Sequence, residues 1–588
     1  MIKLSDYIAK RLKEVYNIKN FFMVSGGGAM HLNDSLGKYI PYIANHHEQA
    51  SAIAAEGYAR VNQDLAVVNV TTGPGGLNCL NGVFGQWTDS VPVLYISGQV
   101  KFSTTIASCP LLNLRQLGDQ EVDIIDVVTP LTKYAKMVTE PGDIKYELDK
   151  AIYEATTGRM GPVWLDIPMN VQAALIDEDN LRDFVPPCKP VCDLKIDEVV
   201  SLLKTAKKPL IIAGHGVRLS KTEEIFFELL KKIDIPVVTT FNGFDVVPDS
   251  NKNYVGRIGT VGQRAGNFAL QNADVILCLG TRNNIRQASY NYENYAKNAY
   301  KIVVDIDEAE LNKPTVKADL KINADLADFL PALVKKIPEI ECKEWLEFSR
   351  DLKEKFCFEN CDEYKERGSE IDPYHFTKVL TQLMHEGDVA TMANGSACVC
   401  MFQTSVIKEN QRIFLNSGDA SMGYGLPASI GACIAHDRKS TVCVEGDGSI
   451  MMNIQELQTI KHNKLPVKIF IINNNGYISI KQTQKNFFEG RMTGAGEDSG
   501  VSVPDFVSVS KAFGIKAVRI ADNNLMKQQI KDVLDAKEPV LCDVVVKSDY
   551  IFTPKLSSRK LDDGTMISSS LEDLYPFLDR DEFNKCKL

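Results

Sequence analysis

Short apolar runs alternate with longer segments of helical periodicity along most of the chain. The runs 65–70, 209–214 and 441–444 are rich in β-branched residues and have the length of buried parallel strands. Similar runs recur at 93–96, 273–280, 301–305 and 466–472. Because strands that alternate with helices form parallel sheets covered on both faces, the pattern predicts an α/β protein built of doubly wound units.

Breaks in this alternation divide the chain into parts. A proline-rich linker occupies residues 184–190, and a charged stretch runs through residues 353–367. We therefore predict three doubly wound α/β domains and a tail: an N-terminal domain (1–175), a central domain (190–340), a C-terminal domain (365–550) and the C-terminal residues 551–588.

Composition narrows the function classes. The chain has 588 residues, 44% of them hydrophobic, and a net charge of -10. Nucleic-acid binding needs a concentrated basic face, which this charge pattern does not favour. The sequence shows neither a signal peptide nor an apolar stretch long enough to span a membrane, so we predict a cytoplasmic protein without a membrane partner. The cysteines lack zinc-site spacing, which favours buried thiols.

The most informative segment lies between Gly446 and Gly476. A strand ends at Gly446-Asp447-Gly448-Ser449, and Ile450, Ile454 and Leu457 then follow a helical period. A second apolar strand leads to Asn473-Asn474-Asn475-Gly476. Asp447 and Asn474 thus lie at the carboxyl ends of two strands, where open α/β sheets bind ligands. With the carbonyl of Gly476 they supply three oxygen ligands for Mg²⁺ on a diphosphate; the alternative is an ordinary glycine turn followed by an asparagine-rich loop.

This segment resembles the thiamin-diphosphate (ThDP) motif, in which Gly-Asp-Gly is followed by a pair of asparagines. The whole chain is similar to the acetolactate synthase branch of the ThDP-dependent 2-oxo acid decarboxylases and carboligases. Matching stretches occur in the same order along the sequence, at 47–50, 56–60, 72–78, 97–100, 161–168, 279–282, 305–307 and 421–428.

The resemblance implies ThDP and Mg²⁺ as cofactors, and pyrimidine-binding, central and diphosphate-binding domains in that order. Glu48 matches the glutamate that hydrogen-bonds the aminopyrimidine ring, although a solvated glutamate is the alternative. Met422 matches the bulky residue beneath the cofactor, and Ala420 offers a carbonyl to the amino group. Further cofactor contacts are expected at Gly73, Asn78, Gly446, Asp447, Gly448, Ser449, Asn474, Gly476 and Tyr477.

The substrate pocket is expected from looser matches. Gln120, Lys133 and Arg286 fall on positions that bind substrate in the synthases, with Arg286 holding an acidic acceptor. Asp119 replaces a phenylalanine and Thr483 replaces a tryptophan, so we expect a more polar pocket. His31 is either an acid/base or a helix cap, and the tail is a candidate lid. These residues complete the expected catalytic set of Glu48, Gln120 and His31.

The predicted reaction is decarboxylation of a 2-oxo acid, pyruvate first, and carboligation of the two-carbon unit to a second carbonyl. Two-carbon transfer to a keto-sugar in bacterial surface-polysaccharide biosynthesis is the alternative, and a non-catalytic regulatory subunit is the alternative of another class. A nicotinamide dehydrogenase would need a Gly-x-Gly-x-x-Gly turn, which the sequence lacks.

Two features beyond the reaction stay open. FAD in the central domain is compatible with Gly280-Thr281-Arg282, but Asn283-Asn284-Ile285 departs from the family pattern. Because the family builds each site between subunits, we expect a homodimer or homotetramer.

Overall fold

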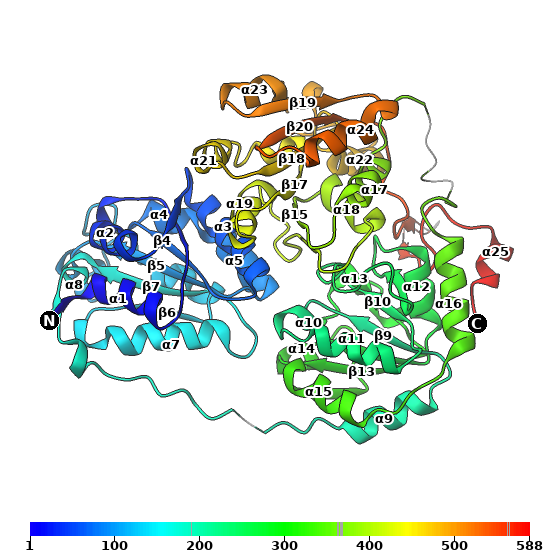
Figure 1. Cartoon of the computed structure of the whole chain (residues 1–588), viewed down its shortest axis with the longest axis horizontal. Coiled ribbons are helices and arrows are strands. Elements are labelled where there is room, and N and C mark those ends of the chain that lie inside the picture. The colour runs from blue at the N-terminus through cyan, green and yellow to red at the C-terminus, as the bar shows by residue number, and fades with distance from the viewer. Residues whose placement is uncertain (190, 362–363, 365–367, 561–562, 564) are drawn as a thin grey trace.

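The computed structural model describes residues 1–189, 191–361, 364, 368–560, 563 and 565–588. Three parallel sheets, each of six strands, form the centres of three separate domains (Figure 1). Helices cover the faces of each sheet, which confirms the predicted fold of three doubly wound α/β domains. The predicted domain starts at residues 190 and 365 lie outside the described residues.

The N-terminal sheet has the strand order β3-β2-β4-β5-β7-β6. Its strands are β2 (Phe21–Met23), β3 (Tyr42–Ala44), β4 (Ala66–Val70), β5 (Val93–Gln99), β6 (Tyr134–Met137) and β7 (Val163–Pro168). Its helices are α1 (Leu4–Glu14), α2 (Met30–Tyr39), α3 (Glu48–Asn62), α4 (Pro74–Asn78), α5 (Leu80–Asp89), α6 (Ile124–Val128), α7 (Ile144–Thr156) and α8 (Met169–Gln172). A short antiparallel pair joins β1 (Ile2–Lys3) to β8 (Leu175–Ile176).

The C-terminal sheet repeats this topology. Its order is β16-β15-β17-β18-β20-β19, so both sheets read 2-1-3-4-6-5 when strands are numbered within the domain. The strands are β15 (Val389–Met392), β16 (Arg412–Phe414), β17 (Thr441–Gly446), β18 (Val467–Asn473), β19 (Lys516–Ile520) and β20 (Val540–Val545). The helices are α17 (Pro373–Leu383), α18 (Ser396–Thr404), α19 (Gly425–Ala435), α20 (Asp447–Ile450), α21 (Glu456–Asn463), α22 (Ile478–Phe487), α23 (Phe506–Ala512) and α24 (Asn523–Leu534).

The middle sheet differs, with the order β11-β10-β9-β12-β13-β14, or 3-2-1-4-5-6 within the domain. This is the strand order of dinucleotide-binding folds. Its strands are β9 (Pro209–Ala213), β10 (Val237–Thr239), β11 (Tyr254–Arg257), β12 (Val275–Leu279), β13 (Tyr300–Asp305) and β14 (Leu320–Asn323). Its helices are α9 (Ile196–Thr205), α10 (Gly216–Leu219), α11 (Glu223–Lys232), α12 (Arg264–Asn272), α13 (Ile285–Ala288), α14 (Glu308–Asn312), α15 (Leu326–Lys336) and α16 (Lys343–Lys355).

The N- and C-terminal domains share a core where α3 packs against α19. A Cβ built on Gly57 would lie 2.1 Å from the carbonyl oxygen of Ala428, and one on Gly431 would lie 1.7 Å from that of Ala54. Glycine therefore lets the two helix backbones touch. One buried hydrophobic cluster, which includes Tyr58, runs across this contact, so the two domains are packed as one body.

The tail lies along the middle domain (Figure 1). Arg264 donates to the carbonyls of Leu574 and Pro576, and Phe583 packs into the core beneath α12. The tail contains β21 (Ser558–Lys560), β22 (Met566–Ser568) and α25 (Arg580–Lys585). Its proposed role as a lid stays a prediction.

One local prediction was wrong. The period of Ile450, Ile454 and Leu457 suggests one helix, but the structure has two, α20 and α21, separated by a turn. Asn453 lies in this turn, fully buried, and donates through Nδ2 to the carbonyl of Gly423 at 2.8 Å. An asparagine whose side chain is used for a backbone contact competes with helix formation. The break brings Asn453 and Glu456 against neighbouring loops.

Candidate functional site

Asp447 is the centre of the C-terminal half of the site. It follows β17 directly, is 2% exposed, and its carboxylate accepts three backbone hydrogen bonds. Oδ1 accepts from the amide of Gly448 at 2.6 Å, and Oδ2 accepts from the amides of Asn474 and Gly476 at 3.0 and 2.9 Å. Burial raises the pKa of Asp447, while these amides act to lower it. The carboxylate is thus fixed where the ends of β17 and β18 meet.

Asn474 presents an unpartnered oxygen beside Asp447. Its amide nitrogen faces two hydroxyls, that of Tyr550 at 3.2 Å and that of Ser396 at 3.4 Å, and these two hydroxyls also bond to each other. Its Oδ1 is buried and has no hydrogen-bond partner. Because buried polar atoms are almost always paired, a free amide oxygen on the residue that donates its backbone amide to Asp447 fits a metal ligand. The residues present therefore suit a Mg²⁺ ion that is also held by phosphate oxygens.

The glycines around Asp447 are not equivalent. A Cβ on Gly448 would lie 2.1 Å from the ring of Tyr477, which packs over the loop. Gly476 has φ +126° and would bring a Cβ to 2.6 Å from the carbonyl of Ala495. Gly446, in contrast, would meet only Ser449 at an ordinary 3.8 Å. Close approach therefore requires glycine at 448 and 476, but not at 446.

The loop with Ala420 and Met422 adjoins this half of the site. Ala420 has φ +59°, an uncommon backbone conformation for alanine, and Met422 is half-buried. The amide of Gly423 donates to Oγ of Ser449 at 2.9 Å. Asn394 donates to the carbonyl of Ser421 at 2.7 Å. The structure thus joins the 420–423 loop to the loop after β17, and non-glycine strain of this kind concentrates at functional sites.

Glu48 is the centre of the N-terminal half of the site. It is the first residue of α3, half-buried, and its Oε2 accepts from Nδ2 of Asn78 at 2.9 Å. Gly73 begins the turn into α4 with φ +61°, and a Cβ there would lie 1.9 Å from the carbonyl of Gln120. The structure therefore brings Glu48 to Asn78 and Gly73 to Gln120.

The expected substrate-binding residues are dispersed. Lys133 is committed to helix α7, because its ammonium donates to the carbonyls of Glu154 and Thr157, and burial lowers its pKa. Thr483 is exposed on α22 and donates to the carbonyl of Ser479 at 3.0 Å. Gln120 is exposed on its loop, and His31 is half-buried in the first turn of α2. Within the described part of the chain, no hydrogen bond or ion pair joins these four residues to Glu48 or Asp447.

Arg286 lies nearer to the C-terminal half of the site. Its guanidinium stacks on Phe241 at 4.1 Å from the ring centroid and approaches Sγ of Cys398 at 3.9 Å. Cys398 is in the first turn of α18, and Ser396, which begins this helix, faces Asn474. A cation–π contact of this kind holds the charged fork in place.

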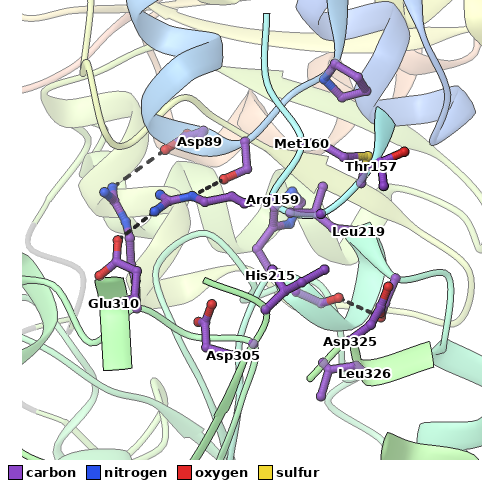
Figure 2. Close-up of a pocket in the computed structure, with 18 of the residues that line it drawn as sticks. Asp89, Thr157, Arg159, Met160, His215, Leu219, Asp305, Glu310, Asp325 and Leu326 are labelled. Atoms are coloured by element: carbon purple, nitrogen blue, oxygen red, sulfur yellow. Dashed lines mark hydrogen bonds and ion pairs between the residues drawn. The ribbon is translucent and has the colours of Figure 1, made fainter. Parts of the chain in front are cut away.

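A cavity of about 870 Å³ lies between the middle and N-terminal domains. Figure 2 shows Arg159, from the N-terminal domain, reaching Glu310 of the middle domain at 2.9 Å. Asp305, whose pKa is raised to about 6 chiefly by burial, lies at the end of β13. His215 lines the cavity after β9, and both of its ring nitrogens are buried without a hydrogen-bond partner. The strand ends of a dinucleotide-binding topology thus open into this space.

Four residues of the site were missed by sequence reasoning: Ser396, Tyr550, Asn453 and Glu456. Ser396 and Tyr550 are far from Asp447 in sequence, so only the fold brings their hydroxyls to Asn474. Asn453 and Glu456 carry a weak signal, because both are polar in a segment that otherwise has helical periodicity.

Comparison with known proteins agrees with this geometry. Family models match in order: the N-terminal TPP binding domain of thiamine pyrophosphate enzymes (residues 2–126), their central domain (196–333) and their C-terminal TPP binding domain (393–544). The chain belongs to the thiamine pyrophosphate enzymes, the class of decarboxylases and carboligases that use thiamin diphosphate.

Within this class the chain is similar to acetolactate synthase large subunits. It is 32% identical to the one from Lactococcus lactis over 93% of each chain. It is 31% identical to the one from Cyanidium caldarium, over 95% of this chain and 96% of the relative. The probable large subunit from Methanocaldococcus jannaschii is also 31% identical, with 93% and 92% covered. In the described part of the chain, no helix combines the length and apolarity that crossing a membrane requires.

Proposed function

We propose that the protein decarboxylates a 2-oxo acid, pyruvate first, and joins the two-carbon unit to a second carbonyl, with ThDP and Mg²⁺ as cofactors. The observation that carries the proposal is the arrangement around Asp447, whose fixed carboxylate accepts from the backbone amide of Asn474, while the side-chain oxygen of Asn474 is buried without a hydrogen-bond partner. Retention of Glu48 and Asp447 together opposes the alternative of a non-catalytic regulatory subunit.

The protein's own residues have distinct roles in this proposal. Asp447 and Asn474 hold the cation, and the amides after β18 stay fixed by Asp447. Glu48 holds a proton at a ring nitrogen of the cofactor, with Asn78 fixing the carboxylate. Bound ThDP supplies the carbon nucleophile that adds to the oxo group. Arg286 favours a substrate that carries a carboxylate, because its fork suits two oxygens.

The acceptor is open between two classes. Two expected pocket positions carry exposed polar residues, Thr483 on α22 and Asp119 next to Gln120 on its loop. Polar residues at these positions favour a hydroxyl-rich acceptor such as a keto-sugar over a small 2-oxo acid. We retain the surface-polysaccharide reaction as the second candidate on this ground.

One experiment tests the proposal and separates the acceptors. The purified protein is incubated with ThDP, Mg²⁺ and pyruvate, alone and with a panel that ends in nucleotide-linked keto-sugars. Mass spectrometry then identifies the products. We expect release of carbon dioxide and one product in which a new carbon–carbon bond joins the two-carbon unit to an acceptor. Neither release nor product in any mixture, with ThDP failing to raise the unfolding temperature, would refute the enzyme.

The cavity at the middle domain is proposed to hold FAD. Gly214, Gly216 and Gly280 come into backbone contact there, since a Cβ on Gly214 would lie 2.3 Å from the carbonyl oxygen of Gly280. Such turns let a nucleotide approach the strand ends closely. The absorbance spectrum of the purified protein, and the nucleotide released on denaturation, decide between FAD and another occupant.

We also propose that the active form is a homodimer or homotetramer. We place it in the cytoplasm, because the sequence shows neither a signal peptide nor a membrane-spanning stretch. Two half-sites on one chain, around Glu48 and around Asp447, support this assembly. Light scattering of the loaded and unloaded protein measures the number of subunits.

A further inference from the structure

Glu456 connects the two half-sites within one chain. It begins α21 in the C-terminal domain, is fully buried, and its carboxylate accepts three hydrogen bonds. Two come from the N-terminal domain: Nδ2 of Asn45 donates to Oε2 at 2.9 Å, and the amide of His46 donates to Oε1 at 3.0 Å. The third comes from Oγ1 of Thr459 in its own helix, at 2.7 Å. Two of the three hydrogen bonds of Glu456 therefore join the C-terminal domain to the N-terminal domain.

The two N-terminal partners lie next to Glu48. Asn45 and His46 follow β3 and precede α3, which begins at Glu48. Asn45 also accepts through Oδ1 from Oγ of Ser51, in the first turns of α3, at 3.1 Å. The backbone is thus fixed on both sides of Glu48. Because hydrogen bonds to a charged carboxylate are stronger than neutral ones, this contact ties the segment before α3 to the C-terminal domain.

The same segment also holds the other parts of the site. Asp447 lies nine residues before Glu456, and between them Ser449 and Asn453 bond to the amide and the carbonyl of Gly423. Residues 447–456 therefore contact the metal loop, the 420–423 loop and the Glu48 loop. Within the described residues, no other side chain of this segment forms a hydrogen bond with residues 45–46. A displacement of Glu456 would therefore affect the position of Glu48 first.

We propose that Glu456 is a positioning residue, which sets the location of Glu48 relative to the cofactor. This inference rests on the proposed function, since it gives Glu48 its role. If Glu456 only joined the two domains, its loss would lower stability and leave turnover of the folded enzyme unchanged. If it positions Glu48, its loss also lowers turnover.

The test compares Glu456→Leu with Glu456→Gln. Leucine has a similar size but no acceptor, so the amide of His46 and the side chain of Asn45 lose their buried partner. Glutamine keeps an oxygen for the amide of His46, and the side-chain amide of Asn45 can turn over to accept from its nitrogen. The glutamine variant is therefore the conservative rescue. Thr459→Val is the matched control, because it removes only the contact within α21.

Two measurements are made on the full chain. Hydrogen exchange of the cofactor-free protein, read by mass spectrometry on peptides that cover residues 43–52, reports the contact directly. We expect exchange to rise about tenfold in Glu456→Leu and to stay near wild type in the glutamine and valine variants, because an opening costs less once a buried bond is lost. At saturating ThDP and Mg²⁺, kcat of the leucine variant should fall about ten- to a hundredfold with KM for pyruvate little changed.

The outcomes are separable. Unchanged exchange in Glu456→Leu would overturn the contact, and raised exchange with unchanged kcat would overturn the positioning role. A wild-type enzyme without ThDP-dependent turnover would refute the proposed function instead, while the exchange data would still test the contact. Should Glu456→Leu not fold, Asn45→Ala probes the same contact from the other domain: we expect raised exchange and a severalfold loss of kcat, and no change in either would overturn the inference.

Discussion

The N- and C-terminal domains have the same strand order, but the key carboxylate of each domain differs in its burial and its hydrogen bonds. Asp447 is 2% exposed and accepts three backbone amides, whereas Glu48 is half-buried and accepts one side-chain amide, from Asn78. A carboxylate that holds a cation gains from a rigid, dry setting. A carboxylate that shares a proton with a ligand has to remain accessible to it. The same topology thus provides one carboxylate in each domain, and the contacts around each carboxylate determine its role.

The largest effect is expected from Glu48→Gln. Glutamine keeps the size and the contact to Asn78, but it cannot take up the proton, so carbon dioxide release from pyruvate should fall about 10²- to 10⁴-fold. Binding of ThDP, measured by calorimetry, should change little. The matched control is Glu409→Gln, at an exposed glutamate. Carbon dioxide release at the wild-type rate would show that Glu48 does not have the proposed proton-holding role.

The second test concerns a buried carboxyl in the N-terminal domain. Asp166 is fully buried, and burial raises its pKa to about 7 despite hydrogen bonds from Ser97 and Gln99. A raised pKa means that the folded state binds a proton more tightly than the unfolded state, so the free energy of unfolding falls as pH rises from about 4 to 7. Asp166→Asn should remove that fall, which is on the order of 4 kcal/mol.

Chemical unfolding at pH 5, 6, 7 and 8 measures this dependence. Asp498→Asn, at an exposed aspartate, is the control and should keep the wild-type slope. An identical pH dependence in wild type and Asp166→Asn would show that this carboxyl does not titrate in the range.

The glycines of the C-terminal half offer the third test. In Gly448→Ala the new Cβ meets the ring of Tyr477, and this overpacking should cost about 1–3 kcal/mol of unfolding free energy and weaken ThDP binding. In Gly446→Ala the new Cβ meets only Ser449, at an ordinary van der Waals distance, so the loss of unfolding free energy should be well under half as large. Equal losses in the two variants would contradict the packing described around Asp447.

The smallest effect is expected from Tyr550→Phe. Removal of the hydroxyl takes one partner from the amide nitrogen of Asn474, which should weaken Mg²⁺ binding about fivefold, or roughly 1 kcal/mol. Titration of the ThDP-loaded enzyme with Mg²⁺ measures the change, and Tyr575→Phe in the tail is the control. An unaltered Mg²⁺ affinity would mean that Ser396 alone orients Asn474.

Most of the fold was predictable, and the substrate pocket was not. The runs at 209–214 and 441–444 form β9 and β17. They were predictable because the strands of a parallel sheet are covered on both faces and are therefore apolar throughout. Lys133 illustrates the limit: its sequence match suggests substrate binding, yet its ammonium donates to the carbonyls at the end of α7. A long side chain reaches several neighbours, and the sequence does not say which one is near.

By itself, the sequence determined the three α/β units and the loop around Asp447, because hydrophobic period and glycine-rich turns are local properties. Only the tertiary structure decided that Tyr550 and Ser396 face Asn474, and that Glu456 holds the loop before Glu48. Those contacts join residues 76 to 410 positions apart. Their formation depends on how whole domains pack, which no local pattern records.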